Sequence, residues 1–147
     1  MKKNFTSSWS GLKKMTEIQV SAIINPTENP NKVILAISNI FGDLEYVTEE
    51  RDGGLQISGN ATGTQSLGLF RDIIARIRIR DASRSFFERI AQKDLLSFGL
   101  NKQAAYARAV SFHQAGDSPL GPIQVKIKGD LIEIIDYLCG KPPGLLF

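Results

Sequence analysis

Two stretches of this chain alternate between polar and apolar residues, and no other feature limits the possible folds as much. Residues 17–24 read EIQVSAII and residues 123–128 read IQVKIK, so that every second side chain is apolar. Successive side chains of a β-strand point to opposite faces of a sheet. Each stretch therefore predicts a strand with one face buried in a core and the other face in solvent.

Helical spacing appears between the predicted strands. Residues 30–41 carry apolar side chains three and four positions apart, with Asn29 placed to cap the helix, Pro30 at its first turn and Gly42 at its end. A longer helical region covers residues 66–91. Its two apolar stripes do not join at a constant period, so we expect a bend or break between Arg78 and Asp81.

The other segments complete an α+β order. Strands are predicted at residues 44–50, 54–60, 95–100 and 107–113, and a closing helix at residues 130–138. The first two of these strands flank an Asp-Gly turn, which is typical of a hairpin. The resulting order is β-α-β-β-α-β-β-β-α, in which helices do not alternate one for one with strands. We therefore predict a mostly antiparallel sheet with helices packed on one face.

The length and composition favour a single folded domain. The chain has 147 residues, of which we assign 15–147 to the domain and 1–14 to a basic leader with four lysines and no acid. The composition of the leader predicts disorder, with a tail that seeks nucleic acid as the alternative. A single cysteine and no visible secretory or membrane-spanning segment favour a cytoplasmic protein without a membrane partner.

No catalytic or cofactor-binding pattern stands out, so we predict a protein that is not an enzyme and has no cofactor. His113 and Cys139 are the only residues of their types and lie far apart in the chain, which makes no Cys/His metal cluster. We interpret Cys139 as a buried apolar residue and His113 as structural or solvent-facing. The glycine-containing segment 59–66 lacks the Gly-Lys-Ser/Thr ending of a phosphate-binding loop.

Charge is distributed unevenly along the chain. Residues 17–55 hold seven acids and two bases, whereas residues 71–108 hold nine bases and four acids. A guanidinium binds a phosphate through two parallel hydrogen bonds, so a convergent set would contact polyanion backbones. The candidate residues are Arg76, Arg78, Arg80, Arg84, Lys102, Gln103, Arg108, Lys126 and Lys128.

Ordinary helix salt bridges are the alternative interpretation of these arginines. Asp72 and Arg76, and Arg84 and Glu88, stand four positions apart, which places each pair on one side of a helix. Lys102 and Gln103 have an alternative too, because they lie in a polar connection between two predicted strands. They either face a ligand or hold that connection in shape.

Three blocks of the chain resemble an archaeal family of uncharacterised proteins that is described as predicted RNA-binding proteins or predicted exosome subunits. The blocks are INPTENPNKVILAISNIFGDLE, LFRDIIARIRIRDASRSFF and FGLNKQAAYARAVSFHQAGDSPLGPIQVKI, within residues 17–138. The resemblance implies a fold similar to that of the 5S-rRNA-binding ribosomal protein of the large subunit. It also implies a homodimer, a structured or ribosomal-type RNA as partner, and a place in an RNA-processing complex, but no catalytic residues.

Two hypotheses follow. The first is a non-enzymatic RNA-binding protein that contacts the RNA backbone or shape through a basic face. The second is a homo-oligomeric assembly subunit without direct RNA contact, in which the acidic and basic segments pair between chains.

Overall fold

Five strands form one antiparallel sheet. The structure, a computed structural model, describes residues 15–51, 53–114 and 120–140. The strand order is β2-β3-β1-β5-β4, so the two alternating stretches are neighbours at the centre of the sheet. The strands are β1 (Glu17–Ile24), β2 (Tyr46–Arg51), β3 (Gly54–Thr62), β4 (Leu95–Leu100) and β5 (Ile123–Lys128).

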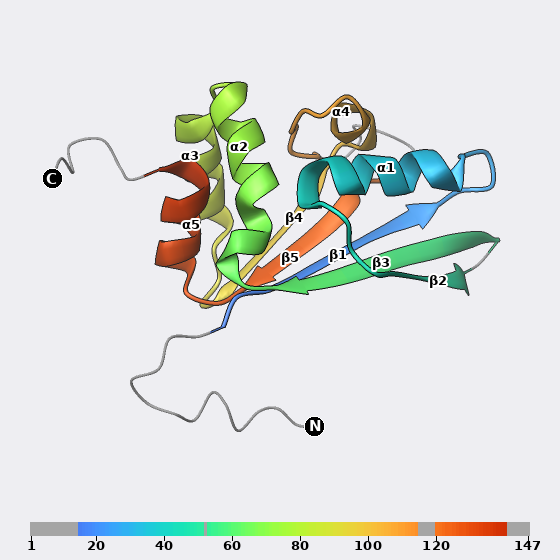
Figure 1. The fold of residues 1–147 in the computed structure, drawn as a ribbon, viewed down its shortest axis with the longest axis horizontal. Coiled ribbons are helices and arrows are strands. Elements are labelled where there is room, and N and C mark those ends of the chain that lie inside the picture. Colours follow the sequence, from blue (N-terminus) through green and yellow to red (C-terminus); the bar gives the residue numbers. More distant parts are fainter. Residues whose placement is uncertain (1–14, 52, 115–119, 141–147) are drawn as a thin grey trace, which may run out of the picture.

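All helices of the described residues lie on one side of this sheet (Figure 1). They are α1 (Pro30–Phe41), α2 (Gly68–Arg76), α3 (Arg80–Ile90), α4 (Lys102–Tyr106) and α5 (Leu131–Cys139), with a 3₁₀ turn η2 (Thr64–Leu67) before α2. The predicted α+β class, with a mostly antiparallel sheet and helices on one face, is confirmed. The opposite side, which we call the open face of the sheet, has no helix over it in Figure 1.

The pairing register explains why one side of the sheet is buried. Val20 lies opposite Gly59 of β3 and Val125 of β5, and the alternate residues on each strand stay in step with it. Paired residues point to the same side of an antiparallel sheet, so the apolar positions of three strands share one face. Residues 18, 20, 22 and 24 of β1 are all buried, as the alternation predicts.

Phenylalanine rings join the helical layer to the sheet. Phe87 of α3 is fully buried, and its ring centroid lies 5.4 Å from that of Phe98 in β4 and 6.3 Å from that of Phe70 in α2. Phe112 adds a third neighbour at 5.5 Å. Tilted and edge-to-face aromatic pairs at such distances stabilise a core beyond the area that they bury.

The helix caps agree with the sequence. The Asn29 side chain accepts a hydrogen bond from the Asn31 amide, at 2.9 Å, and Gly42 ends α1 with φ of 80°. The Asp130 side chain caps α5 through the Glu133 amide. The expected break in the long helical region is also present, because α2 ends at Arg76 and α3 begins at Arg80.

The predicted strand over residues 107–113 is wrong. The short helix α4 precedes these residues, and within them only Phe112 makes an isolated bridge, to Leu100. Asn101 caps α4 by accepting a hydrogen bond from the Ala104 amide at 2.9 Å. The sheet therefore has five strands rather than six among the described residues. Lys102 and Gln103 lie in the connection between β4 and β5, where they begin a helix.

None of the described helices is long and apolar enough to cross a membrane. The basic leader, residues 1–14, lies outside the described residues. The turn of the β2–β3 hairpin includes Gly53, whose φ is 83°, as expected of a tight turn.

The aromatic contacts predict a strong dependence of stability on Phe87. Phe87→Ala should lower the free energy of unfolding by about 3–5 kcal/mol, because it opens a cavity between α3 and the sheet. Urea denaturation followed by circular dichroism measures this. Leu69→Ala in α2 is the control, since Leu69 is 48% exposed and should cost little. Equal effects of the two substitutions would contradict this role of Phe87.

Candidate functional site

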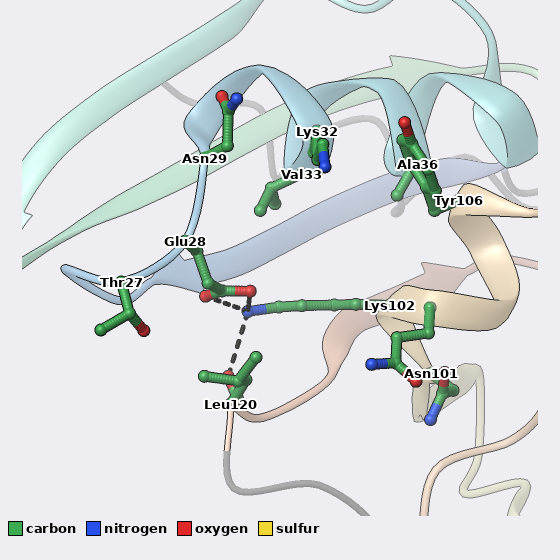
Figure 2. Close-up of a pocket in the computed structure, with 11 residues that line it drawn as sticks. Thr27, Glu28, Asn29, Lys32, Val33, Ala36, Asn101, Lys102, Tyr106 and Leu120 are labelled. Atoms are coloured by element: carbon green, nitrogen blue, oxygen red, sulfur yellow. Dashed lines mark hydrogen bonds and ion pairs between the residues drawn. The ribbon is translucent and has the colours of Figure 1, made fainter.

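A pocket of about 420 Å³ opens between α1 and α4 (Figure 2). We call it the α1–α4 pocket. Its wall on the α1 side includes Lys32, Val33 and Ala36, and its wall on the α4 side includes Gln103 and Tyr106. The volume lies in the range of small-molecule binding sites. Lys102 and Glu28 lie at one end of the pocket, where their charged groups meet.

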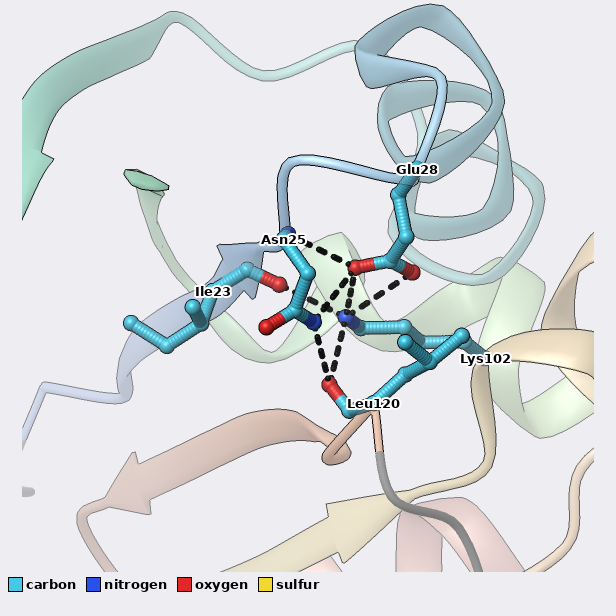
Figure 3. Close-up of polar contacts among 5 residues, drawn as sticks. All are labelled: Ile23, Asn25, Glu28, Lys102 and Leu120. Carbon is cyan, nitrogen blue, oxygen red and sulfur yellow. Dashed lines mark hydrogen bonds and ion pairs between the residues drawn. The ribbon is translucent and has the colours of Figure 1, made fainter. Parts of the chain in front are cut away.

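Lys102 joins segments that are far apart in the chain (Figure 3). Its ammonium donates to the carbonyl oxygens of Ile23, at 2.6 Å, and Leu120, at 3.0 Å. It also contacts both carboxylate oxygens of Glu28, at 3.0 and 3.2 Å. The side chains of Lys102 and Glu28 are only 9% and 11% exposed. The Lys102 charge is therefore compensated inside the protein. This supports the alternative that Lys102 holds the connection in shape rather than facing a ligand.

Hydrogen bonds keep Glu28 ionised in this position. Burial alone would raise the pKa of Glu28, but the Asn25 backbone amide and the Lys102 ammonium outweigh that effect and lower it. The Asn25 side chain donates to Glu28 as well, at 2.8 Å, and to the Leu120 carbonyl at 3.0 Å. The pair is thus nearly neutral overall and does not give this end of the pocket a net charge.

The other sequence candidates lie on different sides of the molecule. Lys126 and Lys128 are exposed on β5 and point to the open face of the sheet, away from the helices. Lys128 stands opposite Glu17 in the pairing register. The candidate arginines belong instead to the helical layer or to the segment that follows α4. The structure does not bring all nine candidates onto one surface.

Arg84 is committed to contacts within the helical layer. Its side chain is 14% exposed and lies 2.9 Å from Asp136 of α5 and 3.6 Å from Glu88. It also donates to the Gly140 carbonyl. The alternative of helix salt bridging is therefore correct for Arg84 and Glu88. It is wrong for Arg76, because Asp72 contacts Arg71 instead.

Three exposed arginines lie where α2 and α4 end, and we call this set the arginine end. It consists of Arg76, Arg78 and Arg108. Arg80, at the start of α3, is exposed as well, but its side chain lies beside Gly140 after α5. The Arg76 guanidinium donates to the Arg108 carbonyl at 2.7 Å, which ties the end of α2 to the segment after α4. No described carboxylate lies within ion-pair distance of these three side chains.

Arg78 occupies a backbone position that normally belongs to glycine. Its φ is 64°, in the left-handed region. The Arg78 amide donates to the Ala75 carbonyl at 3.2 Å, and the Ile79 amide donates to the Ile74 carbonyl at 3.1 Å. These two bonds define a Schellman motif at the end of α2, with Arg78 in its left-handed position.

The end of α4 repeats this arrangement. Arg108 has φ of 63°. Its amide donates to the Ala105 carbonyl at 2.9 Å, and the Ala109 amide donates to the Ala104 carbonyl at 2.8 Å. Two helices thus end side by side in Schellman motifs, each with an exposed arginine where glycine is most common.

Cys139 and His113 show no arrangement suited to nucleophilic chemistry. Burial raises the pKa of the Cys139 thiol to about 11, so the thiol stays protonated at neutral pH. The predicted burial of Cys139 is confirmed. The His113 amide donates to the Gly99 carbonyl at 2.8 Å, and its Nδ1 atom is buried without a partner among the described residues.

Sequence reasoning missed Glu28, Lys32 and Tyr106. Glu28 lies in the loop before α1, and its partner Lys102 comes much later in the chain, so no local pattern connects them. Tyr106 stands just before the predicted strand at residues 107–113, whereas the structure makes it the last residue of a helix beside a pocket. The Asn101 cap and the helix-forming residues after it were the available signal for α4.

The buried ion pair predicts that Lys102→Met destabilises the fold. The substitution leaves Glu28 buried without its cation and should lower the free energy of unfolding by about 3–5 kcal/mol. Chemical denaturation at neutral pH measures this loss. The double variant Lys102→Met with Glu28→Gln should recover part of it, because no uncompensated charge remains. A Lys102→Met protein as stable as the wild type would contradict the structural role.

The lowered pKa of Glu28 predicts an acid-dependent contribution. Since the folded pKa lies below the ordinary value, ionised Glu28 stabilises the fold above that value, and the contribution disappears as pH falls through the folded pKa. The stability gap between wild type and Glu28→Gln should therefore narrow as the pH is lowered from about 7 to about 3. If urea titrations show a difference in the free energy of unfolding that stays constant across this pH range, the prediction is contradicted.

The chain matches known proteins over most of its length. Residues 17–129 match a family model described as RNA binding. A UPF0201 protein of Pyrobaculum aerophilum is 38% identical over 129 residues, which cover 84% of this chain and 90% of that protein. A UPF0201 protein of Metallosphaera sedula is 36% identical over 129 residues, covering 86% of this chain and 90% of the relative.

The fold agrees with that of a solved relative. The 2.2 Å crystal structure of a UPF0201 protein from Methanococcus jannaschii superposes with a TM-score of 0.76 at 30% identity, covering 89% of this chain and 98% of that one. The suspected archaeal family is therefore confirmed, while the likeness to a ribosomal protein stays a prediction. By its sequence and its fold, the chain belongs to the archaeal UPF0201 family, whose family model is described as RNA binding.

Proposed function

We propose that this chain is an RNA-binding module rather than an enzyme, and that the arginine end contacts the RNA backbone. The family supplies the general expectation of RNA binding. The observation that selects the arginine end is the pair of exposed arginines, Arg78 and Arg108, in left-handed positions of two adjacent helix ends.

A left-handed backbone is costly for arginine. A residue with a Cβ atom loses about 1–2 kcal/mol in this conformation, whereas glycine does not. An observed strained residue is a reason to look for a function of its side chain. The favourable interaction of a cation with a helix C-terminus is worth about 0.3–1 kcal/mol and offsets only part of that cost. Binding of a phosphate explains why both of these positions carry arginine.

The local charge also favours this end over the open face of the sheet. The arginine end holds three exposed guanidinium groups with no described ion-pair partner. On the sheet, Lys128 faces the Glu17 position across the strand pair, which offsets its charge. A short-range field of one sign attracts a polyanion even when the whole protein is close to neutral. Planar guanidinium groups also match phosphate oxygens better than ammonium groups do.

Replacing both left-handed arginines separates binding from stability. The double variant Arg78→Gly with Arg108→Gly should keep or slightly raise the thermal midpoint, because glycine suits both backbone positions. It should bind an RNA stem-loop more weakly, and the slope of log K against log salt should become shallower by about 2. Fluorescence anisotropy at several salt concentrations, together with thermal unfolding, measures both quantities.

The control removes the same number of charges from the opposite side. Lys126→Gln with Lys128→Gln should leave RNA affinity and its salt dependence close to those of the wild type. A greater loss from the lysine variant would place binding on the open face and overturn the proposal. Equal losses would show only a general charge effect. If the arginine variant changed oligomeric state in light scattering without affecting RNA, the assembly hypothesis would be favoured.

A further inference from the structure

The α1–α4 pocket combines groups that recognise a nucleotide. Tyr106 is 46% exposed, and the Lys32 ammonium lies 5.8 Å from the centroid of its ring. Gln103 is exposed and lines the pocket together with Tyr106. Its backbone carbonyl accepts from the Ala107 amide, whereas its carboxamide has no hydrogen-bond partner among the described residues. Aromatic rings stack on bases, carboxamides both donate to and accept from base edges, and an ammonium binds phosphate.

We infer that this pocket takes one unpaired nucleotide of the bound RNA, with its base stacked on Tyr106 and its phosphate beside Lys32. This inference rests on the proposed function, because it adds a nucleotide pocket to a surface that binds the backbone. Gln103 lies at the base edge, and Val33 and Ala36 form the apolar wall against which the base packs. The Lys102–Glu28 pair offers no net charge to repel the phosphate.

The pocket is continuous with the arginine end through α4. Tyr106 is the last residue of α4 and Arg108 follows two residues later, so their Cα atoms are less than about 7.6 Å apart. The segment is held firmly at both sides. The Asn39 side chain donates to the Ala105 and Tyr106 carbonyls, each at 3.1 Å, and Arg76 donates to the Arg108 carbonyl. An RNA backbone that is bound at Arg108 therefore places the neighbouring nucleotide close to Tyr106.

This arrangement favours a nucleotide within RNA over a free nucleotide. Among the described residues that line the pocket, Lys32 has the one exposed ammonium for a phosphate, whereas the further cations lie beyond Tyr106 in the arginine end. A free nucleotide would contact only Lys32. An RNA strand contacts both Lys32 and the arginine end, because its chain continues from the pocket across the arginines.

The test compares two RNA probes that differ in one nucleotide. One is a perfect duplex and the other is the same duplex with a single bulged 2-aminopurine. Wild type should prefer the bulged duplex by about 5- to 150-fold, the range of one base stacked on an aromatic side chain. The fluorescence of the bulged 2-aminopurine should be quenched when it stacks on the Tyr106 ring. Tyr106→Phe keeps the ring and should behave like wild type.

Two variants remove the recognition without touching the arginine end. Tyr106→Leu should lose the preference and the quenching while binding the perfect duplex as wild type does. Lys32→Gln, at an exposed position, should reduce the preference without affecting the fold. Full preference retained by both variants would overturn the inference.

The remaining outcomes separate this inference from the proposed function. If wild type binds both probes equally and the Arg78 and Arg108 double variant still loses affinity, the backbone contact stands and the nucleotide pocket is wrong. If neither probe binds at low salt, both ideas are wrong. If free nucleoside monophosphates bind as tightly as the bulged duplex, the pocket belongs to a free nucleotide and the inference fails.

Discussion

The position of α4 depends on one buried ammonium. Lys102 is the first residue of this short helix, and its Nζ atom holds together the end of β1, the loop before α1 and the segment that leads into β5. A five-residue helix has too few internal hydrogen bonds to be stable alone. Its place is therefore set by contacts from outside: Lys102 and the Asn101 cap at its start, and the Asn39 and Arg76 hydrogen bonds at its end. These contacts therefore also set the positions of Tyr106 and Arg108.

This dependence explains why a lysine can be central to a binding surface without touching a ligand. A buried ion pair is seldom a net gain in stability compared with apolar residues of the same shape. It does fix geometry, because the ammonium contacts acceptors on three residues whose positions cannot then vary independently. The arrangement turns a loop-like connection into a rigid support for the two side chains that follow. Lys102 is thus better understood as a positioning residue than as a phosphate contact.

Much of the fold could be predicted from local patterns, whereas the site could not. Alternation in residues 17–24 and 123–128 predicted the two central strands, and Asn29, Pro30 and Gly42 marked the first helix. The error at residues 107–113 arose because alternating apolar residues also occur in irregular segments, and the preceding helix is too short to show a helical period. Glu28 and Lys102 pair across 74 positions, so their contact depends on the folded topology. The left-handed arginines are invisible to patterns, since sequence signals for helix ends rely on glycine.

The distribution of charge over the two sides of the sheet follows from the same topology. Strand register sets Lys128 opposite Glu17 and Lys126 opposite Gln19, so one of the two β5 lysines faces an acidic residue. The helical side has no such register, and no described carboxylate lies within ion-pair distance of the arginines at the ends of α2 and α4. Their proximity stems from a hydrogen bond between an arginine and a backbone carbonyl, which needs no opposite charge. A protein with a modest net charge can in this way concentrate cations at one place without destabilising the rest of its surface.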